Sequence, residues 1–63
     1  MMAPEELVQR LTGSGKEITP ARVQKLARHV QSRSHLTATL ALLSAEDADL
    51  VRSEIEPYIR GLA

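Results

Sequence analysis

Basic side chains recur at helical spacing in the first half of the chain, at Arg22, Lys25, His29 and Arg33. The first three lie within ~60° of arc on one face of an α-helix with 3.6 residues per turn. Guanidinium and ammonium groups gathered on one face bind carboxylates or phosphates. We therefore expect these four residues to form a partner-binding basic face. The alternative is a solvated helix surface, on which the later cations favour the helix C-terminus.

Other residue types that could do chemistry do not combine into a reactive set. His29, Ser32 and a distant acid could be named as a nucleophilic group, but no strained nucleophile turn holds the serine. His29 and His35 are six residues apart, and the chain has no cysteine to complete a zinc site. We expect no catalytic residue, no metal, no cofactor and no small-molecule substrate, and hence no enzyme.

The tetrapeptide "GSGK" at residues 13–16 imitates part of a phosphate-binding loop. A true loop of this kind needs a glycine five residues before the Gly-Lys pair and a serine or threonine after the lysine. Arg10 and Glu17 occupy those places, and the preceding segment is expected to be a helix. Residues 13–18 are therefore predicted to be a flexible connector.

Start and stop signals divide the chain into helices expected at residues 4–12, 19–31, 34–43 and 45–61. Thr19 before Pro20 and Ser44 before Asp47 are typical N-terminal caps, and Ser34 is the expected cap of the third helix. Pro57 is expected to kink the last helix or restart it. No segment alternates as a strand does. The sequence predicts one all-α domain over 1–63, a small bundle of three to four short helices with a helical hairpin core and no β-sheet.

The segment 34–43 is apolar nearly all round, which predicts a buried helix at the centre of the bundle. Leu36, Leu40 and Leu43 share one side, and Ala38 and Leu42 lie on the other. A chain of 63 residues is too small to cover both sides, so we expect Ala38 and Leu42 to mediate self-association in a homodimer.

The stretch "KLARHVQSRSHLTATLALL" from Lys25 to Leu43 resembles helix-turn-helix sequences of DNA-binding proteins. The resemblance implies that the second helix enters a DNA groove. This stretch has a shorter turn without glycine, and after Arg33 its second helix offers mainly Thr37 and Thr39 for reading base edges.

Charge is divided between the two halves of the chain. The formal net charge is zero, with basic residues dominant in 16–35 and acidic residues dominant in 44–63. With neither a secretory leader nor a long apolar run, the chain is expected to be cytoplasmic and not membrane-bound.

The sequence favours a stand-alone regulatory or adaptor module that binds another protein as a homodimer and modulates a larger complex. The alternative is a small dimeric helix-turn-helix-like regulator of transcription that binds DNA or RNA.

Overall fold

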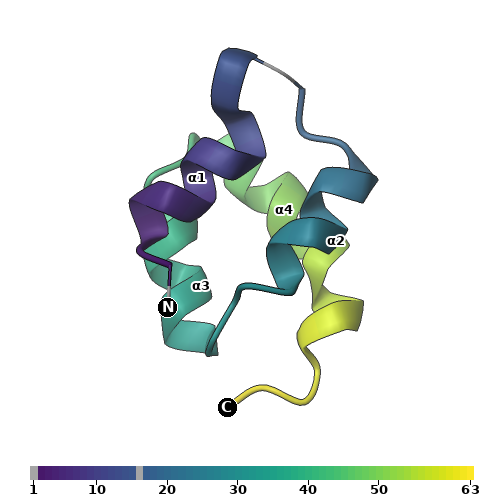
Figure 1. The fold of residues 1–63 in the computed structure, drawn as a ribbon. Coiled ribbons are helices and arrows are strands. Elements are labelled where there is room, and N and C mark those ends of the chain that lie inside the picture. The colour runs from purple at the N-terminus through teal and green to yellow at the C-terminus, as the bar shows by residue number, and fades with distance from the viewer. Residues whose placement is uncertain (1, 16) are drawn as a thin grey trace.

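The computed structural model describes residues 2–15 and 17–63, which fold into four α-helices and a short 3₁₀ helix (Figure 1). No strand is found in these residues, so the predicted all-α class is confirmed. In chain order the elements are α1 (Pro4–Thr12), η1 (Gly13–Gly15), α2 (Pro20–Ala27), α3 (Arg33–Leu40) and α4 (Ala45–Ile59). η1 occupies the first part of the predicted connector, and residue 16 of that connector lies outside the described residues.

Side-chain caps fix where three of the helices begin. The Thr19 hydroxyl accepts a hydrogen bond from the Arg22 amide at 3.3 Å, and the Ser44 hydroxyl accepts one from the Asp47 amide at 3.1 Å. Both predicted caps are confirmed. The predicted cap at Ser34 is wrong, because α3 begins earlier and its N-cap is Ser32, whose hydroxyl accepts from the His35 amide at 3.1 Å.

Two of the predicted helices are too long. α2 ends at Ala27, and the amides of Arg28, His29 and Val30 then bond to carbonyls three residues back, as in a 3₁₀ turn. Val30 still reaches the core, with 7% of its surface exposed. Its apolar side chain therefore continues the helical pattern beyond the helix. α3 likewise ends at Leu40 and is followed by tight turns.

α4 is the longest helix and supplies the largest share of the core. Its buried residues are Ala48, Val51, Ile55 and Ile59, and it continues through Pro57 without a restart. Pro57 has no amide to bond to the carbonyl of Ser53, so α4 continues with one helical hydrogen bond fewer. The other buried apolar residues are Leu7, Leu11, Val23, Leu26, Val30, Leu36 and Leu40.

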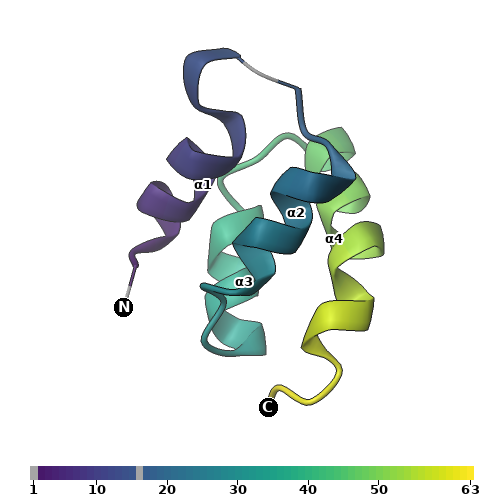
Figure 2. The same cartoon turned by 45° about the vertical axis from the view of Figure 1, so that its right-hand side comes forward.

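The helices pair in alternation along the chain. α2 packs mainly on α4, and α1 packs mainly on α3, while the backbones of α2 and α3 do not come close to each other. Figure 2 shows α2 between α1 and α4, with α3 behind it. The expected position of the 34–43 helix at the centre of the bundle is wrong. α3 lies at the edge because only its Leu36, Thr39 and Leu40 are buried.

Candidate partner-binding groove

A groove of about 610 Å³ runs between α1 and α2. Its base is leucine, from Leu7 and Leu11 on α1 and Leu26 on α2, all three buried in the core. Its rim is polar and strongly basic. The remaining lining residues are Arg10, Thr19, Ala21, Arg22, Lys25, Arg28 and His29.

The rim collects cations from three parts of the chain. Arg10 comes from the end of α1, Arg22 and Lys25 come from α2, and Arg28 comes from the turn that follows α2. No carboxylate is found among the described lining residues. The two ion pairs in the described part of the chain involve Arg33 and Arg52, which lie outside the groove. The groove therefore carries four formal positive charges, with His29 beside them.

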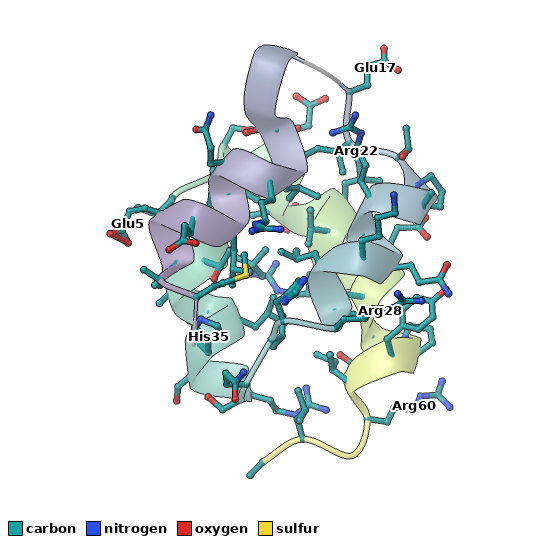
Figure 3. The ribbon with its side chains drawn as sticks, in the orientation of Figure 1. Glu5, Glu17, Arg22, Arg28, His35 and Arg60 are labelled. Carbon is teal, nitrogen blue, oxygen red and sulfur yellow. The ribbon has the colours of Figure 1, made fainter. Side chains whose placement is uncertain are left out.

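Arg22 also has a structural role in the groove. It is half-buried, and its Nη1 donates a hydrogen bond to the Leu11 carbonyl at 3.4 Å. This bond ties the start of α2 to the end of α1 and so fixes the distance between the two walls. Figure 3 places Arg22 at the N-terminal end of α2 and Arg28 at its C-terminal end, so the charges span the length of the helix.

The structure brings three of the four predicted basic-face residues together. Arg22, Lys25 and His29 all line the groove, as the helical spacing predicts. Arg33 does not join them. Its guanidinium donates to the Leu62 carbonyl at 3.2 Å, to the Ile59 carbonyl at 3.5 Å and to Glu56 at 3.2 Å. It lies there because α2 ends before it, and α3 directs it to the end of α4.

Two groove residues are absent from the sequence prediction. Arg10 is three residues from Leu7 and next to Leu11, but nothing local indicates that this side of α1 faces α2. Arg28 lies three residues after Lys25, which places the two side chains on neighbouring sides of a helix, so this spacing could have indicated it.

The residues predicted to mediate self-association lie on the outer face at the end of α3. Ala38 is exposed, and Leu42 has 51% of its surface exposed. Their exposed neighbours include Ser34, Thr37 and Ala41, which are small. Because α3 is at the edge of the bundle, this face is a shallow surface with one large apolar side chain, not the second side of a central helix.

The geometry of α2 and α3 also differs from a helix-turn-helix. In that motif the two helices are joined by a turn of about three to four residues and pack together. Here residues 28–32 separate them, and the backbones of the two helices do not pack closely against each other. Arg33, the one cation of α3, is bound to the end of α4.

His35 serves the fold. Its Nδ1 accepts a hydrogen bond from the Gln31 amide at 3.0 Å, and its Nε2 lies 2.8 Å from the Met2 carbonyl.

Within the residues that the structure describes, no group of three His, Cys, Asp or Glu side chains could hold a metal ion. No helix in that part of the chain is both long and apolar enough to cross a bilayer.

Comparison with known proteins gives no relative: no family model, curated protein or solved structure matches this chain. The groove and its charges are therefore the basis for a functional proposal.

Proposed function

We propose that this chain is a small protein-binding module that takes an acidic segment of another protein into the groove between α1 and α2. The observation that carries the proposal is a rim of four cations with no carboxylate among the described lining residues. Like charges held close together repel each other in the free protein, and an acidic ligand relieves that repulsion. A regulatory or adaptor role in a larger complex follows from such capture.

The groove suits a segment that is acidic and partly apolar. Arg10, Lys25 and Arg28 are exposed, and their aliphatic stems flank the groove above the leucine base. Ala21 adds a further exposed methyl group. A ligand can therefore place carboxylates against the charged ends while its apolar atoms cover the stems. Arginine is favoured in such contacts because its planar guanidinium binds a carboxylate through two hydrogen bonds.

The observations favour a protein over a nucleic acid. The lining contains no Phe, Tyr or Trp on which a base could stack, and its single imidazole is that of His29. On α3 the exposed Ser34, Thr37 and Ala38 cannot read base edges as Arg, Asn or Gln do. The acidic residues of α4 would also repel a polyanion. Binding of DNA or RNA, by a helix-turn-helix-like dimer or otherwise, is the alternative outcome of the following experiment.

The test uses labelled probes of defined charge, measured by fluorescence anisotropy. The probes are a glutamate-rich amphipathic peptide, its lysine-rich counterpart, a single-stranded RNA and a DNA duplex. We expect the chain to bind the acidic peptide in preference to the others. Lys25→Glu with Arg28→Glu should weaken that binding at least about tenfold, because each reversal turns an attraction into a repulsion.

The matched control is Arg52→Glu with Arg60→Glu, which makes the same change of charge on α4 and at its C-cap, outside the groove. This control should keep wild-type affinity for the acidic peptide. Equal loss in both double variants would show that net charge, and not the groove, decides binding. Preference for the duplex or the RNA, with affinity falling steeply between about 50 and about 200 mM salt, would establish the nucleic-acid alternative instead.

A further inference from the structure

An exposed stripe on α4 complements the groove in charge. Leu50, Glu54 and Tyr58 follow one another at four-residue intervals, so they lie along one side of the helix. Leu50 is 43% exposed and Tyr58 is 52% exposed. Tyr58 is also the only aromatic residue of the chain. The stripe thus presents two large exposed side chains with a carboxylate between them, a mixture that suits contact with a basic and partly apolar surface.

The stripe lies on an exposed side of α4, next to the segment that leads from α1 into α2. Asp47 and Leu50 line a small pocket together with Glu17 and Ile18, in the segment that leads into α2. The opposite side of α4 is directed towards α3, where Glu56 pairs with Arg33. The stripe and the groove are therefore on neighbouring sides of α2, as the arrangement of α1, α2 and α4 in Figure 2 indicates.

The charge near the stripe is negative. Glu17, Asp47 and Glu54 lie on or beside it. Arg52 lies about 160° round the helix from Glu54 at 100° per residue, and it pairs with Asp49 at 3.0 Å. The groove and the stripe thus carry opposite charge within a chain whose formal net charge is zero.

We propose that the groove of one copy binds the α4 stripe of a second copy, in a dimer with a two-fold axis beside α2. Because groove and stripe flank the same helix, one rotation places each stripe on the partner's groove. Such a dimer is closed and uses both complementary surfaces twice. It occupies the groove of the proposed function, so self-association and capture of an acidic segment exclude each other.

The dimer surface includes specific contacts beyond net charge. Tyr58 can stack on a guanidinium of the groove, and Glu54 can pair with Lys25 or Arg28. A stable interface needs about 800 Å² per partner, about a fifth of the 4163 Å² of this chain. The groove, α2 and the stripe together form a broad face. The outer face of α3 around Leu42 offers one large apolar side chain, so it is the weaker candidate.

The experiment reverses the charge of the groove in one variant and the charge of the stripe in another. Sedimentation equilibrium then measures the mass of each variant in solution. The groove variant is Lys25→Glu with Arg28→Glu, and the stripe variant is Glu17→Lys with Glu54→Lys. We expect a wild-type dimer at high micromolar concentration, while each variant alone is a monomer of unchanged helicity. An equimolar mixture of the two variants should dimerise again, because both contacts of the heterodimer are then complementary.

Leu42→Glu is the control for the other surface, and it should remain dimeric. The proposal fails if the wild-type chain is monomeric, if the mixed variants stay monomeric, or if Leu42→Glu dissociates the dimer while the groove variant does not. These results are separate from the peptide-binding test. A monomeric chain that binds the acidic peptide overturns the dimer alone. A chain that dimerises as proposed, but binds no acidic peptide at concentrations low enough to make it monomeric, overturns the proposed function alone.

Discussion

The guanidinium of Arg33 at the start of α3 lies 3.2 Å from the carboxylate of Glu56 near the end of α4, and it also donates to two backbone carbonyls there. Both side chains of the pair are about half exposed, at 46% and 47%. Solvent screening leaves such an ion pair worth at most about 1 kcal/mol. The backbone bonds give Arg33 its larger role, because its guanidinium holds the Leu62 carbonyl just after α4 and shares the Ile59 carbonyl with the Leu62 amide.

Arg33→Ala should therefore destabilise the protein more than Glu56→Gln does. We expect a loss of about 1–2 kcal/mol for the arginine and less than about 0.5 kcal/mol for the glutamate, measured by urea unfolding. Equal losses for the two variants would mean that the ion pair alone fastens α3 to the end of α4.

The imidazole of His35 is expected to be the Nε2–H tautomer. A backbone amide can only donate, so the Gln31 amide requires a bare Nδ1, and Nε2 then donates to the Met2 carbonyl. A long-range proton–nitrogen NMR correlation reads the tautomer directly. A protonated Nδ1 at neutral pH would contradict this bonding.

Replacing His35 with Phe should cost about 1–2 kcal/mol, since two hydrogen bonds between α3 and its surroundings are lost. The Gln31 amide should exchange with solvent faster in this variant. His29→Phe is the matched control, because His29 is exposed at the groove rim, and its effect should stay within about 0.5 kcal/mol.

The N-terminus of α3 offers a direct comparison of two serines. Ser32→Ala should cost about 1 kcal/mol, because the His35 amide loses the hydroxyl that caps it. Ser34 is exposed inside the first turn, and Ser34→Ala should leave the free energy of unfolding almost unchanged. Thermal unfolding of the two variants measures the difference, and the reverse order would place the cap at Ser34.

Substitutions at Ile55 and Leu50 compare how much the buried side and the exposed side of α4 contribute to stability. Ile55 is fully buried, so Ile55→Ala should cost about 2–5 kcal/mol, which is comparable to the whole stability of so small a domain. Leu50→Ala should change the stability of the monomer by less than about 1 kcal/mol. Circular dichroism should show a partly unfolded Ile55→Ala chain at room temperature and a folded Leu50→Ala chain. Similar losses would mean that the exposed stripe is part of the core.

The features that depend on neighbouring residues could be predicted from the sequence. The range of α1 and the caps at Thr19 and Ser44 follow from signals within a few residues of each boundary. The end of α2 could not be located in this way, because Val30 keeps the helical apolar spacing although it lies in a turn. The spacing of hydrophobic residues indicates which side chains are buried. A tight turn can bury the same side chain as a continued helix would, so the spacing does not show where the helix ends.

The candidate site could be predicted only in part, and for a related reason. Arg22, Lys25 and His29 share one face of a short segment, which the spacing alone establishes. The contribution of Arg10 depends on how α1 packs against α2, and the departure of Arg33 depends on the end of α4. Contacts between distant segments are not encoded in the periodicity of either segment.

The alternating order in which the helices pair affects how this chain must fold. α1 has its main partner in α3, and α2 has its main partner in α4, so a cut between α2 and α3 would separate every helix from its main partner. Neither half can therefore form a stable hairpin as an early unit, and the entropy of closing long loops must be overcome before the main contacts form. For a helical protein of 63 residues, this topology favours slow, all-or-none folding. The two halves produced by such a cut should regain structure only when they are mixed.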